Sequence, residues 1–360
     1  MANNAFAAFP PLRRRPGQPV LHPAVLNLER GVLIRDGENV LQGFVRLPEI
    51  PSIPCCHERG VIMFYVKWTR TSPQHDFEET EDVVVVKKLF REKLHPDAQE
   101  DPFQEIHLMQ RYGDNVHISK ILEALCTPKY IYLVMPWLGH DLFNTMWYPR
   151  NDERQLPIVR HPWTPARVKA LLLNLLYFQV NALILRDVSP CNIICSVHDD
   201  HCPHIDLAMA LQVVVIEGIP QRIAAGQPWC GKGPYTAPEA IHQRELGFSL
   251  DIWSMAVSIL TIALGEQNIW NLCLLGNGLF DLTYHFLIMR GALNNPEMLT
   301  ESINELNNIN AHEYRHIVRN LQRIHDMDPK LRNLLARMLK PNAGDRPSIR
   351  ELLVDPYFTA

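Results

Sequence analysis

The sequence predicts an α+β protein of two lobes, a small β-rich lobe followed by a larger helical one. Three observations lead to this prediction. The chain has 360 residues, enough for one large or two smaller domains. From 31 to 90, short apolar runs alternate with turns, a pattern typical of antiparallel strands. Beyond 164, long amphipathic stretches with helical spacing dominate, and no internal repeat is present.

Composition and charge exclude several classes of protein. Hydrophobic residues make up 47% of the chain and charged residues 21%, which excludes a disordered, collagen-like or disulfide-stapled chain. The net charge of -4 gives no global basic field, so we expect neither nucleic acid nor a membrane as partner. Eight scattered cysteines and the lack of a signal-peptide pattern indicate a reducing intracellular setting, the cytoplasm or alternatively the nucleus.

The first segment, 1–30, is expected to be a disordered tail. It holds five prolines between positions 10 and 23 and three consecutive arginines at 13–15. A nuclear address or a transit peptide is an alternative reading of the arginines, but a solvated basic run is favoured. The folded domain is then expected to cover 31–360.

The first lobe is expected to contain five strands and one helix. The strands are predicted at 43–47, 60–68, 83–86, 118–125 and 130–135, and the helix at 104–112.

The second lobe is expected to be helical. The apolar stretch 252–264 is too short for a membrane span and predicts a buried core helix. Two further helices are predicted at 297–309 and 314–324. They thicken the lobe or, alternatively, form a docking surface for a regulatory partner.

Chemistry-bearing residues recur in a fixed order along the chain. Lys87 follows three valines, and Glu105 comes eighteen residues later on the predicted helix. A strand lysine held by a helix glutamate presents a fixed ammonium to phosphate oxygens. Further on come four motifs: Arg186-Asp187 with Asn192 five residues after the aspartate, Asp206-Leu207-Ala208, Ala237-Pro238-Glu239, and Asp251-Ile252-Trp253.

Read in order, these motifs resemble the signature set of the eukaryotic protein kinase superfamily. The resemblance covers about 40–358 and implies a bilobal protein kinase fold. The N-lobe would span about 31–135, the hinge about 136–141 and the C-lobe about 142–360. The set as a whole is specific, whereas each residue alone is more typical of a strand end or a turn.

The resemblance also assigns roles to individual residues, with ATP and Mg²⁺ as cofactors and a protein as substrate. Lys87 matches the lysine that grips the α and β phosphates, and Glu105 positions it. Asp187 matches the catalytic aspartate that accepts the hydroxyl proton, while Asn192 and Asp206 match the metal ligands.

The nucleotide's base and sugar would be bound near the hinge. Met135 resembles the gatekeeper, and backbone groups around Pro136 and Leu138 would pair with adenine. Val85 takes the place of the usual alanine against adenine, and Asp141 could reach the ribose.

One departure from the family pattern concerns the glycine-rich phosphate loop. No G-x-G-x-x-G precedes Lys87, only the isolated Gly43 and Gly60. Glycines let backbone N–H groups approach phosphate closely, so their loss predicts weaker nucleotide binding.

A second departure involves two positions that change together. The lysine usual two residues after the catalytic aspartate is Ser189, and the threonine usual before the Ala-Pro-Glu motif is Lys232. We hypothesise that the ammonium has moved from one loop to the other and still faces the γ-phosphate. The alternative is that Lys232 is only an exposed side chain.

Other positions are expected to support the fold. Glu239 is predicted to form a buried ion pair with Arg346, and Asp251 to brace the catalytic loop. Leu185, Leu207 and Met109 would form an apolar column. Because 207–234 holds no Ser, Thr or Tyr, Glu217 is expected to pair with Arg186 in place of a phosphate.

A rival motif is a group of thiols and imidazoles between two of the catalytic motifs. Zinc is an alternative for this group, although the spacing matches no standard site. Its members are Cys191, Cys195, His198, His201, Cys202 and His204.

The predicted function is transfer of the ATP γ-phosphate to Ser or Thr hydroxyls of proteins. The loop from Asp187 to Asn192 lacks the arginine and alanine of tyrosine kinases. The alternative is a catalytically weak pseudokinase that acts as a binding or scaffold module.

Overall fold

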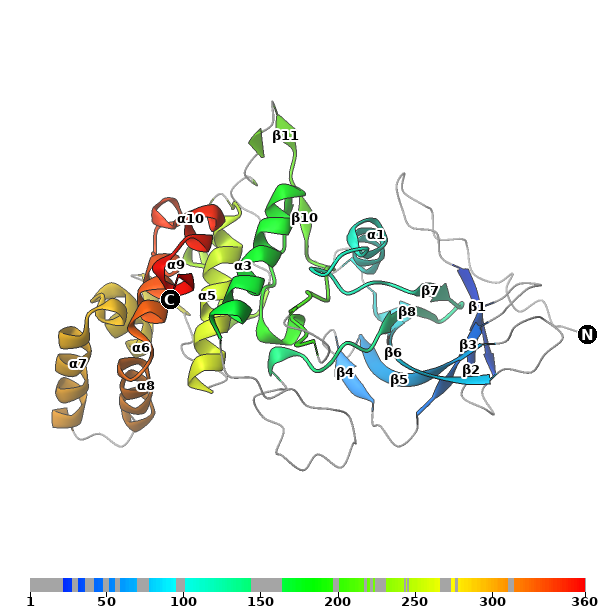
Figure 1. Cartoon of the computed structure of the whole chain (residues 1–360), viewed down its shortest axis with the longest axis horizontal. Coiled ribbons are helices and arrows are strands. Elements are labelled where there is room, and N and C mark those ends of the chain that lie inside the picture. Colours follow the sequence, from blue (N-terminus) through cyan, green and yellow to red (C-terminus); the bar gives the residue numbers. More distant parts are fainter. Residues whose placement is uncertain are drawn as a thin grey trace, which may run out of the picture. The chain divides into compact units, whose positions relative to one another are not determined.

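A computed structural model shows the chain as two compact units (Figure 1). It describes residues 22–27, 32–35, 42–47, 52–55, 59–69, 78–94, 101–143, 164–196, 201–216, 219–220, 223, 231–242, 244, 246–265, 273–275, 278–309 and 314–359. One unit comprises 1–138 with 150–157, and the other 139–149 with 158–360. The division between Leu138 and Gly139 lies inside the range predicted as the hinge. Each unit is described by itself.

The described part of the first unit contains eight strands and the helix α1. Its described elements are β1 (His22–Asn27), β2 (Val32–Arg35), β3 (Gln42–Arg46), β4 (Ile53–Cys55), β5 (Gly60–Thr69), β6 (Glu78–Phe90), the 3-10 turn Arg91–Lys93, α1 (Pro102–Tyr112), β7 (Glu123–Cys126) and β8 (Tyr130–Pro136).

The sheet of this unit closes on itself. Its strand order is β3-β2-β1-β7-β8-β6-β5-β4, and β3 also pairs with β5. In the described part of the chain the strand pairs are antiparallel, except that β1 runs parallel to β7. Closure buries one face of the sheet as a core, since alternate residues of a strand point to the same face. The buried members of this core are Phe44, Tyr65, Val84, Val86, Leu125, Tyr132 and Val134.

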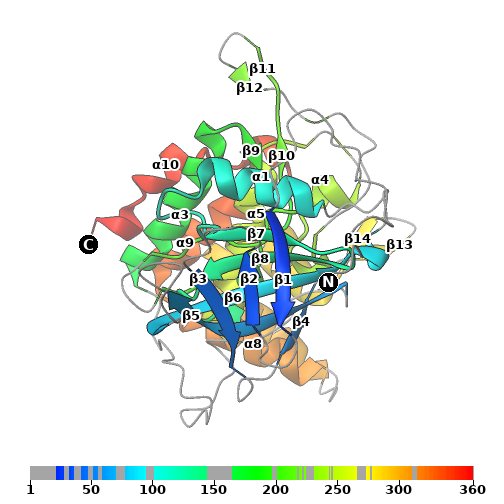
Figure 2. The same cartoon turned by 90° about the vertical axis from the view of Figure 1, so that its right-hand side faces the viewer.

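A residue on the opposite face of β6 contacts helix α1. Lys87 lies between two residues of the other face, and its side chain contacts Glu105 on α1. Asp101 caps the first turn of α1, where its carboxylate accepts a hydrogen bond from the Phe103 N–H, and Pro102 occupies the first helical position. Figure 2 shows α1 beside the sheet. The predicted helix at 104–112 is thus confirmed.

Strand β1 corrects part of the tail prediction, because His22–Asn27 lies within 1–30. This segment pairs with β2 and, through His22 and Pro23, with Leu125 and Cys126 of β7. The one proline of this strand, Pro23, lies near its start and outside the described pairing with β2, where the missing N–H donor is tolerated. Residues 1–21 and 28–30 lie outside the described part of the chain.

Strand boundaries also differ from the prediction in two places. Strand β6 begins at Glu78, so the acidic run before the valines is part of it, with Glu78 and Glu79 opposite Thr69 and Trp68. Strand β7 begins at Glu123 instead of 118. Ile118 is buried and forms an isolated β-bridge before β7, so it lies outside the continuous strand.

The second unit is mainly helical. Its helices of ten or more residues are α3 (Pro165–Val180), α5 (Ser249–Leu264), α7 (Pro296–Ile309), α8 (Arg315–His325) and α9 (Pro329–Met338). Shorter helices are α4 (Pro238–Ile241), α6 (Leu282–Tyr284), the π-helical turn His285–Met289 and α10 (Ile349–Leu353), with 3-10 turns at Pro190–Asn192, Gly233–Tyr235, Ala292–Asn294, Ala343–Asp345 and Pro356–Phe358. Short strand pairs are β9 (Leu183–Ile184) with β10 (Leu211–Gln212), β11 (Val215–Ile216) with β12 (Ile219–Pro220), and β13 (Cys273–Leu275) with β14 (Gly278–Phe280).

Helix α5 forms the core of this unit, as its apolar sequence predicts. Residues from Leu250 to Thr261 are buried, and Gly265 ends the helix in a left-handed conformation, φ 63°. Helices α7 and α8 confirm the two predicted at 297–309 and 314–324. Within the described residues, the structure contains no helix whose length and apolar content would suit a bilayer crossing.

Candidate active site

Lys87 and Glu105 form a buried ion pair in the first unit. The Lys87 ammonium lies 3.0 Å and 2.8 Å from the two carboxylate oxygens of Glu105. The side chains are 6% and 1% exposed, so neither charge is solvated by bulk water. An ammonium held by both oxygens has a fixed position, which is the geometry that binding of phosphate oxygens requires.

The residues predicted to face adenine lie on neighbouring strands. Val85 in β6 is opposite Met135 in β8, and the Trp137 N–H donates to the Val83 carbonyl oxygen at 3.1 Å. Met135 is buried, while Val85, Pro136 and Leu138 are half-buried. Asp141 belongs to the second unit, where it forms a β-bridge with Ile194.

A hairpin between β4 and β5 precedes Lys87 where the family has its glycine-rich loop. Cys55 pairs with Gly60, so the connection is 56–59, with the sequence Cys-His-Glu-Arg. The carbonyl oxygen of Arg59 accepts a hydrogen bond from the Phe90 N–H at 2.8 Å. Of these four residues only Arg59 is described. None of the four is glycine, the residue type that lets backbone N–H groups approach phosphate closely.

In the second unit, Asp187 and Asn192 are held together by the short catalytic loop. The Nδ2 group of Asn192 donates to the Asp187 carbonyl oxygen at 2.9 Å and to its Oδ2 at 2.7 Å. The 3-10 turn Pro190–Asn192 folds the intervening chain so that a five-residue spacing returns the amide to the carboxylate. The sequence predicted this proximity.

Lys232 reaches the same group from 40 residues further along the chain. Its Nζ lies 3.0 Å from Asp187 Oδ2, 3.1 Å from Ser189 Oγ and 3.2 Å from Asn192 Oδ1. The backbone N–H of Lys232 also donates to Asp187 Oδ1 at 3.1 Å. The ammonium therefore lies beside Ser189, the position from which the family's lysine extends.

The charges around Lys232 favour its protonated form. Burial lowers the pKa of Lys232, but the nearby charge of Asp187, together with Cys191 and Asp206, outweighs burial and raises it above its ordinary value. The charge of Asp206 thus acts on the ammonium as well. Burial raises the pKa of the Cys191 thiol, which the Lys232 charge partly opposes.

Gly231 lies against the catalytic loop, a position that the sequence pattern did not reveal. It adopts φ +86°, and a Cβ there would lie 2.6 Å from the Arg186 carbonyl oxygen and 3.4 Å from Asp187 Oδ1. Only glycine fits between these atoms, and the close approach of its backbone to the catalytic loop places the next residue, Lys232, beside Asp187. In the sequence, the feature that could have indicated this position is the glycine directly before Lys232.

Two residues next to the reacting groups have strained backbone conformations. Arg186 has φ +67° and Asp206 has φ +59°, in the left-handed region that non-glycine residues rarely adopt. Such conformations cost of order 1–2 kcal/mol and persist where surrounding contacts hold them. The backbone at Arg186 is held by Asp251. The Asp251 carboxylate accepts hydrogen bonds from the Leu185 N–H at 2.8 Å and the Arg186 N–H at 3.0 Å.

The predicted support contacts in the second unit are present. Arg346 donates from its two terminal guanidinium nitrogens, Nη1 and Nη2, to the Glu239 carboxylate, at 2.6 Å and 2.8 Å, and both side chains are buried. Leu185 and Leu207 are buried in this unit, and Met109 is buried in the other. Glu217 lies outside the described residues, so its pairing with Arg186 stays a prediction.

The group of thiols and imidazoles does not form a cluster in the part of the chain that is described. Cys195 Sγ accepts a hydrogen bond from Arg167, and the His204 ring packs edge-on against Phe178 with centroids 5.2 Å apart. No three His, Cys, Asp or Glu side chains among the described residues are grouped to hold a metal ion. His198 lies outside those residues.

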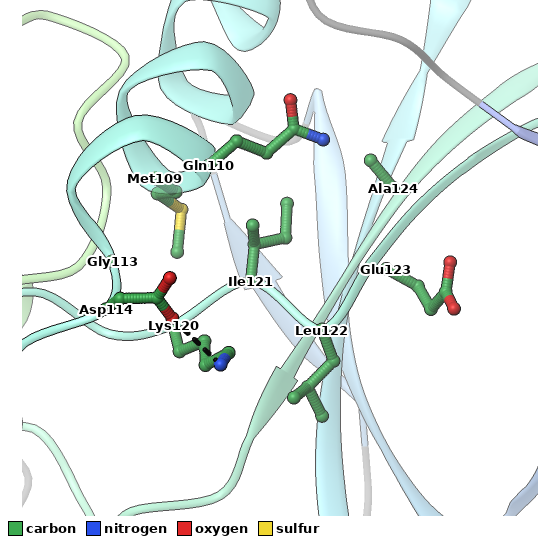
Figure 3. A pocket seen from close by; sticks show the side chains of 9 residues that line it. All are labelled: Met109, Gln110, Gly113, Asp114, Lys120, Ile121, Leu122, Glu123 and Ala124. Atoms are coloured by element: carbon green, nitrogen blue, oxygen red, sulfur yellow. Dashed lines mark ion pairs between the residues drawn. The ribbon is translucent and has the colours of Figure 1, made fainter.

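A pocket of about 270 Å³ opens at the end of α1 in the first unit (Figure 3). Met109 and Ile121 project toward it, and the ion pair of Asp114 with Lys120, 2.9 Å long, lies at its rim. Met109 follows Glu105 by one helical turn. The pocket is therefore lined by the helix that positions Lys87 and not by the reacting groups.

The structure thus collects the predicted residues in two sets. Lys87 and Glu105 are together in the first unit, with Val85, Met135, Pro136 and Leu138. Asp187, Asn192 and Lys232 are in contact in the second unit, where Asp206 influences Lys232 electrostatically.

Comparison with known proteins identifies the family of the chain. A family model described as "Protein kinase domain" matches residues 75–358, and the chain belongs to this family. The match begins at 75 and so covers β6 with Lys87 but not the strands before it.

Individual relatives are distant. Ribosomal protein S6 kinase alpha-6 from Mus musculus is 26% identical over 208 residues, which are 54% of this chain and 25% of the relative. Cyclin-dependent kinase 20 from Danio rerio is 24% identical over 296 residues, 78% of this chain and 77% of the relative. The serine/threonine-protein kinase PAK mbt from Drosophila melanogaster is 23% identical over 277 residues, 76% of this chain and 35% of the relative. The chain spans about a quarter of the length of the first relative.

Proposed function

We propose that this protein is a serine/threonine protein kinase that transfers the γ-phosphate of ATP to a protein hydroxyl. The observation that carries the proposal is the contact set around Asp187. Its carboxylate is 12% exposed and is oriented by Asn192, by the Lys232 ammonium and by the Lys232 backbone N–H. A carboxylate so held can accept a proton from an incoming hydroxyl without reorganising.

The roles of the residues follow from charge and position. Asp187 would orient the substrate hydroxyl and take its proton, while the ammonium groups of Lys87 and Lys232 would offset the negative charge of the phosphates. Phosphoryl transfer requires little covalent chemistry from the protein, so holding the reactants in line supplies much of the rate. Glu105 acts through Lys87 as a positioning residue.

Of the two residues expected to bind Mg²⁺, Asp206 suits the ion better than Asn192. Asp206 offers a half-buried carboxylate held in a strained backbone conformation beside the reacting groups. Mg²⁺ is commonly bound by one or two carboxylates together with substrate phosphates and water. Asn192 fits less well because its Oδ1 accepts a hydrogen bond from Lys232. When bound, the cation would neutralise charge on the transferring phosphate.

The preference for Ser and Thr rests on two supports. The loop from Asp187 to Asn192 lacks the arginine and alanine pattern of tyrosine kinases. The curated relatives include proteins named as serine/threonine-protein kinases. A protein substrate, a regulatory partner on the C-lobe and a cytoplasmic or nuclear location are part of the same proposal.

A second candidate function is supported by the β4–β5 hairpin. Because its connection, 56–59, contains no glycine, we expect phosphate binding by backbone N–H groups to be weak there. A pseudokinase would keep the fold and serve as a binding or scaffold module with little phosphate transfer.

A kinase assay separates the two candidates. Transfer of labelled γ-phosphate to a generic Ser/Thr protein substrate is measured with Mg²⁺-ATP for the native protein, Asp187→Asn and the exposed control Asp345→Asn. The proposed kinase requires transfer by the native protein and the control and its loss in Asp187→Asn. Equal incorporation by all three proteins would remove the enzymatic claim. Stabilisation by ATP in a thermal shift without any transfer would support the scaffold.

A further inference from the structure

We propose that the segment directly before β1 continues the parallel pairing along β7 and places Leu21 in the pocket at the end of α1. In that position it holds the helix that carries Glu105 against the sheet. The inference concerns the first unit alone and does not depend on phosphate transfer. Leu21 lies outside the described part of the chain, and its place is inferred from the described elements around it.

The register of β1 on β7 determines where the chain before His22 runs. The two strands form a parallel pair, in which His22 is opposite Leu125 and Pro23 is opposite Cys126. In a parallel pair, one residue earlier in one strand corresponds to one residue earlier in the other. The residue before β1, Leu21, is therefore opposite Ala124, and Ala124 lines the pocket.

The face of the sheet to which Leu21 points follows from its neighbours. Leu133 in β8 is opposite both Ala124 and Lys87, and the Lys87 ammonium contacts Glu105 on α1. Figure 3 shows the Ala124 side chain directed toward the helix. Residues opposite each other in neighbouring strands point to the same face of a sheet. The side chain of Leu21 therefore points toward α1.

The residues of the segment suit this position. In the described part of the chain, β2 is opposite β1 from Ala24 onward, so the chain before His22 lies at an edge of the sheet. An edge tolerates a proline such as Pro19, which has no N–H to donate, and Val20 favours an extended backbone.

The pocket suits an aliphatic side chain. Its volume is about 270 Å³, and its apolar lining includes Met109, Ile121 and Ala124. Met109 and Ile121 project toward it (Figure 3). A leucine side chain has no polar group that needs a partner, and its removal from water against apolar atoms is favourable. Leu21 is joined to His22, so it is present at a high effective concentration and a second molecule competes poorly.

An occupant of this pocket acts on the helix that positions Lys87. Met109 follows Glu105 by four residues, and residues four apart lie on the same side of a helix. Contact with Met109 therefore holds the turn of α1 next to the one that carries Glu105. Leu21 is a positioning residue in this arrangement, because it acts through the helix.

Disulfide trapping tests the register. Leu21→Cys is combined with Ala124→Cys in a Cys126→Ser background, oxidised mildly and analysed by mass spectrometry. Opposite residues of neighbouring strands meet the Cα separation that a disulfide requires. We expect this pair to form an intrachain bond, with a yield about tenfold lower for the control Val20→Cys with Ala124→Cys, because its sulfur points to the other face. Pro23→Cys with the native Cys126 is the positive control, since these positions are opposite each other.

Hydrogen–deuterium exchange tests the effect on α1. Leu21→Asp would bring a charge into the apolar part of the pocket, which opposes docking of the segment. We expect the amides of α1 and β7 to exchange about tenfold faster in this variant, because both elements lose a packing partner. Leu12→Asp makes the same change further from β1 and should leave this exchange as it is in the native protein.

Each contrary result overturns the inference. Equal trapping of the test pair and its Val20→Cys control would show that the segment has no fixed register on β7. A bond between two chains, seen as a dimer on a non-reducing gel, would assign the pocket to the segment of a second copy. Unchanged exchange in Leu21→Asp would remove the role in holding α1. If Ala124→Cys does not fold, the comparison of Leu21→Asp with Leu12→Asp still decides.

Discussion

The ammonium of Lys232 donates a hydrogen bond to the hydroxyl of Ser189, 3.1 Å away, across 43 residues of chain. In the family pattern the lysine stands on the catalytic loop and the hydroxyl residue on the later segment. Here the two side chains are exchanged, and the cation and the hydroxyl still meet beside Asp187. The relationship gives the first of five predictions.

Exchanging the two residues back should preserve phosphate transfer. Lys232→Thr removes the ammonium, and we expect at least a tenfold lower kcat because a charge near the phosphate is lost. Adding Ser189→Lys to that variant restores a cation from the other loop and should recover most of the activity. Ser189→Lys alone places two ammonium groups together and should impair activity. A double variant no better than Lys232→Thr would contradict the exchange.

Replacing Gly231 with alanine should displace Lys232. The added Cβ would lie 2.6 Å from the Arg186 carbonyl oxygen, and the residue has φ +86°. We expect a loss of stability of about 1–3 kcal/mol and a larger loss of transfer activity. Gly291→Ala is the matched control, since Gly291 has φ +71° but nothing within 4 Å of the added carbon. Denaturant unfolding and the kinase assay should separate the two variants.

Asp251 should make stability depend on pH in a defined direction. Burial raises its pKa to about 7, against the hydrogen bonds from Leu185 and Arg186 and the charge of Arg186 that lower it. The folded state therefore binds a proton that the unfolded chain has released above about pH 4. The contribution of Asp251 to the free energy of unfolding is therefore greatest below pH 4, and it falls by up to about 4 kcal/mol as the pH rises to 7.

The Asp251→Asn variant tests this dependence, because asparagine does not titrate. The stability advantage of the native protein over this variant should shrink between pH 5 and pH 7.5 in urea unfolding. A constant difference across that range would show that Asp251 has an ordinary pKa.

Removing the carboxylate of Glu105 should destabilise the first unit and weaken nucleotide binding. Glu105→Gln leaves the Lys87 ammonium buried without its counter-charge, which typically costs about 3–5 kcal/mol. The exposed Glu92→Gln is the control and should change stability by less than about 0.5 kcal/mol. Chemical denaturation and fluorescent nucleotide titration measure the two effects. Equal behaviour of the two variants would count against the assigned role of Glu105.

The ion pair of Glu239 with Arg346 should show strong coupling. Either Glu239→Gln or Arg346→Met leaves the partner charge buried, so each should cost about 3–5 kcal/mol in the free energy of unfolding. The double variant should cost clearly less than the sum, since no unpaired charge remains. A double-mutant cycle by denaturant unfolding measures this coupling, and strictly additive effects would disprove it.

Local pattern was sufficient for much of the fold. The spacing of apolar residues located α1, α7 and α8, because a helix repeats its buried face every 3.6 residues, and the continuous apolar stretch 252–264 located α5. Strand β7 was predicted too long, because the buried Ile118 forms only an isolated bridge before the continuous strand begins at Glu123. Strand β1 was missed altogether, since its partners in β2 and β7 are not visible in its own residues.

The candidate site was predictable to a similar extent. Asp187 and Asn192 are five residues apart, so a single turn brings them together, and their contact could be inferred. The exchange of Ser189 and Lys232 could be inferred only by comparison with the family pattern. Gly231 was not recognised, because its importance lies in its distance to the Arg186 carbonyl oxygen.

By itself the sequence determined the class of protein, the order of its elements and the residue types available for phosphate transfer. These properties depend on local periodicity and on motifs that can be read along the chain. Only the tertiary structure decided that the first sheet closes through β1 and that Lys232 occupies the oxygen of Asn192. Both depend on contacts between segments at least 40 residues apart, which follow from the path of the folded chain and not from any single stretch of it.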